Sequence, residues 1–172
     1  MSEVVTEIRG TAGLITLDRP RAMNALSLDM IRGLTATLLA WAGDVRVQRV
    51  AVRGMGREGP FGTFCAGGDI RFFHQAVLDG DPRLEDFFTE EYTLNHLIHD
   101  YPKPYTVFLD GVVMGGGMGI WASNAECFFQ VPLDNDAAAD LWWQSKTALS
   151  PDLHAHKPMA LIMLRRNVLL AF

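Results

Sequence analysis

Two short glycine-rich stretches decide which fold and chemistry this sequence can support. They read Phe64-Cys65-Ala66-Gly67-Gly68-Asp69-Ile70-Arg71 and Met114-Gly115-Gly116-Gly117-Met118-Gly119. Small residues at a junction between a strand and a helix leave backbone N–H groups without intrahelical partners. Two such donors that converge on one oxygen stabilise negative charge there, as a thioester carbonyl requires when it becomes an oxyanion or enolate. The alternative is that the glycines only permit tight turns and close packing of a helix on a strand.

The segments around these stretches alternate between strand and helix. Residues 4–8 and 14–17 predict two strands joined across Gly10–Gly13, and apolar runs predict further strands at 49–53 and 105–109. Ser27 is a suitable N-cap for a helix to about Ala42, and further helices are expected over 69–78 and 82–101. Strands separated by helices imply right-handed parallel crossovers, so the expected class is α/β, opened by an antiparallel hairpin.

Composition excludes several classes of function. The chain has 172 residues, a net charge of −5 and only two cysteines, Cys65 and Cys127. We therefore expect no nucleic-acid partner, no attraction to acidic membranes and no disulfide framework. No apolar run reaches the roughly 18–20 residues of a membrane span, so no membrane partner is expected. The first residues have no positive region before an apolar run, which favours a cytoplasmic protein.

Cofactor and metal motifs are not expected either. Neither glycine stretch has the Gly-x-Gly-x-x-Gly spacing of a dinucleotide site. The five histidines include no His-Glu-x-x-His motif, and His154-x-His156 lies in an expected loop, where this short pattern seldom means a metal site. The sequence thus predicts no metal and no resident cofactor.

Glu91 is the most informative single residue. The apolar residues of the 82–101 helix recur at intervals of three and four: Leu84, Phe87, Phe88, Leu94, Ile98 and Tyr101. Glu91 falls on this apolar stripe, whereas its neighbour Glu90 falls towards the polar side. A carboxylate that faces the interior costs several kcal/mol unless it is paired or functional. The alternative to a functional Glu91 is a glutamate that is paired or that lies at the edge of the stripe.

Two further residues next to the first glycine pair could take part in chemistry. Cys65 could be a nucleophile, but no histidine stands at a partner spacing, and a cysteine in an apolar strand is usually a small core residue. Asp69 begins a helix, which is most simply explained as a cap.

In this order, the two glycine stretches resemble the crotonase superfamily, also called enoyl-CoA hydratase/isomerase. The segments 87–95, Phe-Phe-Thr-Glu-Glu-Tyr-Thr-Leu-Asn, and 102–105, Pro-Lys-Pro-Tyr, resemble its 3-hydroxyisobutyryl-CoA hydrolase branch, which hydrolyses a thioester in valine breakdown. Leu17-Asp18-Arg19-Pro20 and Asn24-Ala25-Leu26 also fit the superfamily. The resemblance covers about residues 4–125 and implies a crotonase-like spiral of strand–helix units.

The resemblance implies roles for five residues. The backbone N–H groups of Gly68 and Gly116 would form the oxyanion hole for the carbonyl of an acyl-CoA, with Gly67 and Asp69 beside them at the substrate. Glu91 matches a glutamate that contacts the substrate in the hydrolase branch. Coenzyme A would enter only as part of the substrate, and superfamily members are usually oligomers.

The resemblance also separates two enzyme classes. Gly119 stands where true hydratases of the superfamily carry a catalytic glutamate, so a hydratase is disfavoured. The family's Pro-Glu and Pro-Asp segments, which carry its acid/base and covalent chemistry, would fall at Ala139 and Thr147, and neither residue is a carboxylate.

The sequence therefore predicts a partial acyl-CoA-binding core at residues 1–125 and an unrelated tail at 126–172, which resembles out-of-frame translation. We expect no clear strand in the tail and poor packing of its Trp142-Trp143 pair. The alternative is that the chain is a genuinely diverged short member of the family. The expected function is that of a 3-hydroxyisobutyryl-CoA hydrolase-like protein with impaired turnover. The alternatives are an enoyl-CoA hydratase or isomerase and a non-catalytic acyl-CoA-binding fragment.

Overall fold

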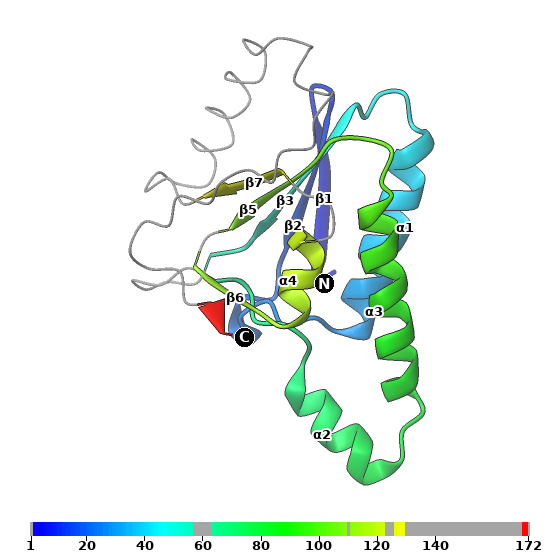
Figure 1. The fold of residues 1–172 in the computed structure, drawn as a ribbon, viewed down its shortest axis with the longest axis vertical. Coiled ribbons are helices and arrows are strands. Elements are labelled where there is room, and N and C mark those ends of the chain that lie inside the picture. The colour runs from blue at the N-terminus through cyan, green and yellow to red at the C-terminus, as the bar shows by residue number, and fades with distance from the viewer. Residues whose placement is uncertain (1, 57–62, 110, 123–125, 130–169, 172) are drawn as a thin grey trace.

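The computed structural model describes residues 2–56, 63–109, 111–122, 126–129 and 170–171 (Figure 1). Its elements alternate between strands and helices after an opening hairpin. In chain order they are β1 Val4–Arg9, β2 Ala12–Leu17, the 3₁₀ turn η1 Pro20–Ala22, α1 Leu28–Gly43, β3 Arg49–Gly54, β4 Thr63–Cys65, α2 Ile70–Asp79, α3 Arg83–His99, β5 Tyr105–Leu109, β6 Val112–Met114, α4 Gly116–Ala122, β7 Glu126–Phe129 and β8 Leu170–Ala171. The expected α/β class is confirmed.

The larger sheet has the order β1-β2-β3-β5-β7. β1 pairs antiparallel with β2, and every other pair is parallel. The register places Ile15, Val52 and Val107 side by side, and all three are fully buried. Strands buried on both faces are expected for a parallel sheet, and all six residues of β2 are buried.

The opening hairpin turns more tightly than expected. Arg9 pairs with Ala12, so Gly10 and Thr11 alone form the connection. Gly10 has a φ of 59°, which glycine adopts without steric cost. β2 therefore begins at Ala12 and not beyond Gly13, because Ala12 and Gly13 already pair with β1 and with β3.

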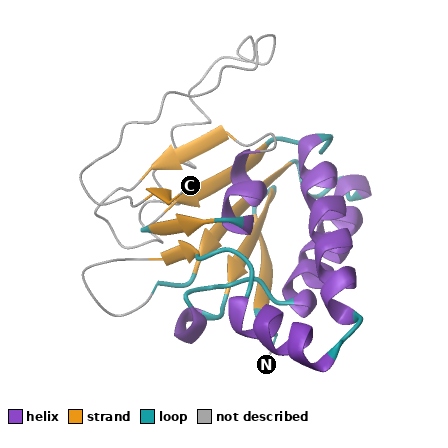
Figure 2. Cartoon of the chain, turned by 60° about the horizontal axis from the view of Figure 1, so that its bottom comes forward, coloured by secondary structure: helices purple, strands orange, loops and turns teal. Residues whose placement is uncertain are grey.

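Helices α1 and α3 lie side by side along one face of this sheet (Figures 1 and 2). Ser27 caps α1 by accepting a hydrogen bond from the Met30 N–H at 3.1 Å, as predicted. At the other end of α1, the Lys103 ammonium donates to the carbonyls of Trp41 and Asp44. The predicted helices are confirmed, although α3 ends at His99 and not at Tyr101.

The apolar stripe of α3 is narrower than expected. Phe87, Leu94 and Ile98 are fully buried, but Phe88 is 40% exposed. The residue lies at the edge of the stripe, where its ring packs against Phe73 of α2 with the centroids 5.1 Å apart. No helix in the described part of the chain is both long and apolar enough to cross a membrane.

A second sheet has the order β4-β6-β8, again parallel. Our expectation of no clear strand after residue 125 is wrong at β7 and at β8. β7 extends the parallel ladder of β5, and such a pairing of four residues has no periodicity that a sequence can reveal. The expected poor packing of the tail concerns mainly residues 130–169, which lie outside the described residues.

A matched pair of substitutions in α1 tests where the core lies. Leu38 is fully buried and its neighbour Leu39 is 59% exposed. We expect Leu38→Ala to lower the free energy of unfolding by about 2–5 kcal/mol, because it leaves a cavity, and Leu39→Ala to change it by less than about 0.5 kcal/mol. Urea denaturation followed by circular dichroism measures both. Equal effects would show that α1 does not pack on the sheet as described.

Candidate functional site

The two glycine stretches meet in space, although 47 positions separate Gly67 from Met114 in the chain. A Cβ atom added to Gly67 would lie 2.8 Å from the Met114 carbonyl oxygen and 3.4 Å from the Gly115 Cα. Gly67 has a φ of 91° and Gly115 a φ of 47°. Both positions require glycine, Gly67 for the close approach of the backbones and both for the left-handed conformation.

Hydrogen bonding sets the direction of the Gly68 N–H. Leu26 receives one bond and gives one: its N–H donates to Gly67 O at 2.7 Å, and its carbonyl accepts from the Asp69 N–H at 3.0 Å. In this parallel bridge the N–H of the intervening residue, Gly68, points away from Leu26. Gly116 is the first residue of α4, so its N–H has no partner within the helix.

A cleft of about 600 Å³ lies where these two segments face α3. Gly67, Gly68, Gly115 and Gly116 line its floor, and hydrophobic side chains such as Phe73 and Phe88 line its wall. The polar side chains of α3 that reach it are Glu91, Tyr92 and Asn95. The structure thus brings four of the predicted site residues, Gly67, Gly68, Glu91 and Gly116, into one cavity.

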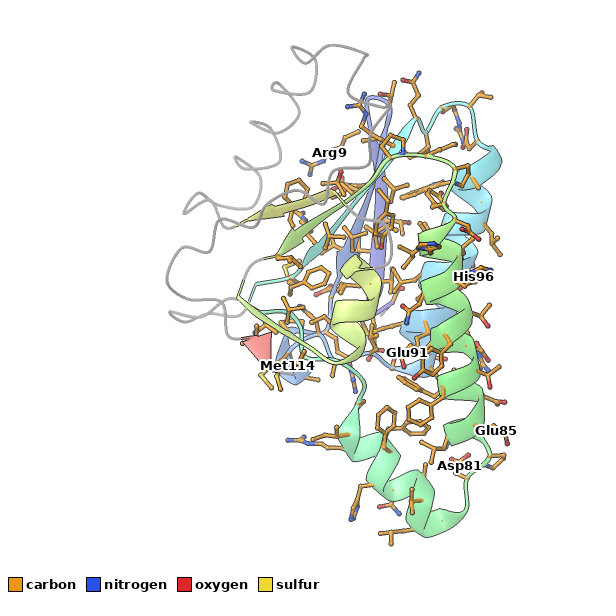
Figure 3. The ribbon with its side chains drawn as sticks, in the orientation of Figure 1. Arg9, Asp81, Glu85, Glu91, His96 and Met114 are labelled. Atoms are coloured by element: carbon orange, nitrogen blue, oxygen red, sulfur yellow. The ribbon has the colours of Figure 1, made fainter. Side chains whose placement is uncertain are left out.

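Glu91 is only 9% exposed and lies directly over Gly116. A Cβ atom on Gly116 would collide with the Glu91 Oε1, so glycine is needed there for the carboxyl group to approach the backbone. Figure 3 shows Glu91 on the side of α3 that faces α4, with Glu85 and His96 on other sides of the helix. Burial raises the pKa of Glu91 above its ordinary value.

Among the described residues none forms an ion pair or hydrogen bond with the Glu91 side chain, so pairing does not account for its position there. Its neighbour Glu90 is paired, because its carboxylate accepts three bonds from the Arg32 guanidinium. A buried carboxyl group without a described partner, in a cleft beside backbone amides, makes this cleft the candidate functional site.

Asp69 does not line the cleft. Its carboxylate caps α2 by accepting bonds from the N–H groups of Arg71 and Phe72, and it pairs with Arg19 at 2.7 Å. Partial burial opposes its ionisation, but the Arg19 guanidinium and the two N–H donors outweigh burial and lower the pKa of Asp69. The structure favours the cap that the sequence suggested over contact with a substrate.

Cys65 is a core residue. It is fully buried, and burial raises the pKa of its thiol to about 12, which leaves almost no thiolate at neutral pH. A Cβ atom on Gly117 would lie 2.6 Å from the Cys65 carbonyl oxygen, so α4 packs directly on β4 at this point.

Asn95 was missed by the sequence analysis. It follows Glu91 by one helical turn, lines the same cleft and packs against Gly119. Its position four residues after an inward-facing glutamate was the signal that could have indicated it. Within the described ranges, no group of three histidine, cysteine, aspartate or glutamate side chains could hold a metal ion. His154 and His156, and the positions Ala139 and Thr147, lie outside the described residues.

The fold and the cleft define a class: a protein with parallel strand–helix units that presents backbone amides and a buried carboxyl group to a ligand. Residues 12–127 match the family model described as enoyl-CoA hydratase/isomerase, and the chain belongs to this crotonase family.

The relatives narrow the comparison. The chain is 48% identical over 111 residues to 3-hydroxyisobutyryl-CoA hydrolase, mitochondrial, of Xenopus tropicalis, covering 64% of this chain and 28% of that protein. It is 45% identical over 119 residues to the Danio rerio protein of the same name, covering 69% of this chain and 30% of the relative. The chain therefore spans less than a third of the length of these curated relatives.

Among solved structures, the chain is similar to an enoyl-CoA hydratase from Rhodobacter sphaeroides, with a TM-score of 0.63 and 41% identity over 69% of this chain and 34% of that one. A carnitinyl-CoA dehydratase from Mycobacterium thermoresistibile gives a TM-score of 0.64 and 40% identity, covering 72% of this chain and 35% of that one. Both likenesses confirm the expected crotonase fold.

A glycine pair tests the close approach at the floor of the cleft. We expect Gly67→Ala to lower the free energy of unfolding by about 2–4 kcal/mol, since the positive φ and the Met114 carbonyl both oppose a Cβ atom. Gly43→Ala at the end of α1 meets nothing within 4 Å and should be neutral or stabilising by up to about 1 kcal/mol. Thermal unfolding measures both. A harmless Gly67→Ala would contradict the contact between the two stretches.

The raised pKa of Glu91 predicts a pH dependence of stability. A carboxyl group whose pKa is raised on folding makes its full contribution to stability below its unfolded pKa of about 4.3, and this contribution is lost as pH rises through the folded pKa. The free energy of unfolding of the natural chain should thus fall relative to that of Glu91→Gln between pH 4 and pH 8. Denaturant titrations at several pH values measure the difference.

Glu85→Gln is the control, because Glu85 lies on the exposed side of α3. It shows how much of the pH-dependent difference in the free energy of unfolding follows from removing any carboxylate. If the difference between the natural chain and Glu91→Gln stayed constant with pH, the carboxyl group would be solvated and not buried as described.

Proposed function

We propose that this chain binds a short hydroxyacyl-CoA in the manner of the 3-hydroxyisobutyryl-CoA hydrolases that it resembles, in the valine breakdown to which that branch belongs. The observation that carries the proposal is the unpaired, buried carboxyl group of Glu91 above Gly116, in the cleft that Gly67 and Gly68 also line.

In this proposal the thioester carbonyl accepts hydrogen bonds from the N–H groups of Gly68 and Gly116. Both groups are oriented by the backbone and need no rearrangement when charge develops on the oxygen, which is how preorganised donors stabilise an oxyanion. Gly67 lets the two segments approach, and coenzyme A enters as part of the substrate. Phe73 and Phe88 would pack against the acyl or pantetheine chain.

Glu91 would accept a hydrogen bond from the hydroxyl group of the acyl chain. A buried polar group that is left unpaired is costly, so this contact would favour a hydroxyacyl thioester over a plain one. Gly119 supports this assignment over a hydratase. A side chain at position 119 would run into the Asn95 amide, and a glutamate could not be placed there without moving it.

Turnover needs a further group. Thioester hydrolysis requires a carboxylate that attacks the carbonyl or activates water, besides the oxyanion donors. Among the described residues that line the cleft, Glu91 is the single carboxyl group, and the family's spacing reaches Ala139 and Thr147. We propose that binding is retained and that hydrolysis is reduced by several orders of magnitude. The second candidate function is that of a purely non-catalytic acyl-CoA-binding protein. We also propose that the chain forms an oligomer, because members of the superfamily usually do.

Calorimetric titration and a free-thiol release assay test the proposal together. We expect 3-hydroxyisobutyryl-CoA to bind to the natural chain and thiol release to stay close to the uncatalysed rate. Glu91→Gln should weaken binding of the hydroxyacyl form by about tenfold, the effect of roughly 1.4 kcal/mol, because a charge-assisted hydrogen bond is lost.

Glu85→Gln is the matched control, since Glu85 lies on the exposed side of the same helix. Rapid release of thiol by the natural chain would refute the loss of turnover. Failure of the natural chain to bind any acyl-CoA would refute the proposed function itself.

A further inference from the structure

The cleft contains a second polar side chain, that of Asn95, to which the proposed function assigns no role. Asn95 extends from α3 one turn after Glu91, so both side chains reach the cavity from the same face of the helix. Its amide lies flat against Gly119, where a Cβ atom would stand 2.6 Å from Nδ2 and 2.7 Å from Oδ1. Glycine at position 119 is therefore what allows the amide to lie there.

The two ends of the Asn95 amide differ in their surroundings. Oδ1 is buried and has no hydrogen-bond partner within the described ranges. Nδ2 is not among the buried atoms that lack a partner, and no described residue accepts a bond from it. Because Asn95 lines the cleft, the edge of the amide that the cavity exposes is the Nδ2 edge. A buried polar atom without a partner is unfavourable, and it persists where the side chain is held for another purpose.

Glu91 and Asn95 form a complementary pair. An ionised carboxylate only accepts hydrogen bonds, whereas the Nδ2 group only donates them. A hydroxyl group does both at once, since it donates its proton and accepts on its oxygen. A methyl or methylene group at the same place satisfies neither.

We propose that Asn95 is a specificity-determining residue. Its Nδ2 donates to the oxygen of the substrate hydroxyl whose proton is directed at Glu91. This inference rests on the proposed function, because it assigns a second contact in the same site. It gives a common role to the inward-facing Asn95 and to the glycine at position 119. The pair would select a hydroxyacyl thioester against its deoxy analogue.

Calorimetric titration with 3-hydroxyisobutyryl-CoA and with isobutyryl-CoA tests the inference, because the two thioesters differ by one hydroxyl group. We expect the natural chain to bind the hydroxylated form about tenfold more tightly. Asn95→Leu keeps the size of the side chain and removes its donors, so it should bring the ratio of the two Kd values to about one. Asn95→Asp replaces the donor by an acceptor and should abolish the preference as well.

Two further variants separate this role from a structural one. His96→Gln changes the next residue of the same helix, whose side chain is exposed, and should leave the ratio unchanged. Gly119→Ala keeps Asn95 but pushes its amide aside, so it should also abolish the preference. Circular dichroism shows whether each variant folds. If Asn95→Leu does not fold, Gly119→Ala still tests the inference.

The outcomes distinguish the two proposals. If neither thioester binds to the natural chain, the proposed function fails and this inference fails with it. If both bind and the preference survives in Asn95→Asp and Gly119→Ala but is lost in Glu91→Gln, the inference about Asn95 alone is overturned.

Discussion

The close approach of two backbones, at Gly67 and at Gly115, is the constraint on which the rest of the structure depends. Neither residue could carry a side chain in its conformation without strain, and a Cβ atom on Gly67 would touch the Met114 carbonyl. The parallel pairing of β4 with β6 brings the segments to this point, and the contact of Gly117 with Cys65 seats α4 on β4. The floor of the cleft and the first turn of α4 both follow from this contact.

A polar network anchors the first of these segments to the opening hairpin. The Arg19 guanidinium pairs with Glu3 of the N-terminal segment and with Asp69, and it donates to the Ala25 carbonyl. Asn24 is fully buried, and its amide donates to the carbonyls of Met55 and Thr63. Replacing Asn24 would leave these two carbonyls without its donors, so we expect the network to help hold the segment before α2 in place.

The elements that could be predicted from the sequence have a local cause. The spacing of Met30, Leu34 and Leu38 indicated α1, and the position of Glu91 among apolar residues indicated that it faces inward. The pairing of β7 with β5 depends on residues 20 positions apart, so four residues alone could not reveal it. Asp69 was assigned to the substrate by resemblance, whereas its partner Arg19 comes from a distant segment that spacing could not identify. The spacing from Glu91 could have indicated that Asn95 faces inward, but its contact with Gly119 became evident only once α4 was placed against α3.

The parallel sheet also has a kinetic consequence. The hairpin of β1 and β2 is the one described strand pair of the larger sheet that a turn alone connects, whereas β2 and β3 are separated by α1. Two helices, α2 and α3, lie between β3 and β5 in the chain, so Val52 can pair with Val107 only after this intervening segment has formed a closed loop. Contacts between residues far apart in sequence slow folding, because the loop must be closed before the pairing repays its entropy. During synthesis, β3 therefore leaves the ribosome while β5, its partner on one side, is still to be made.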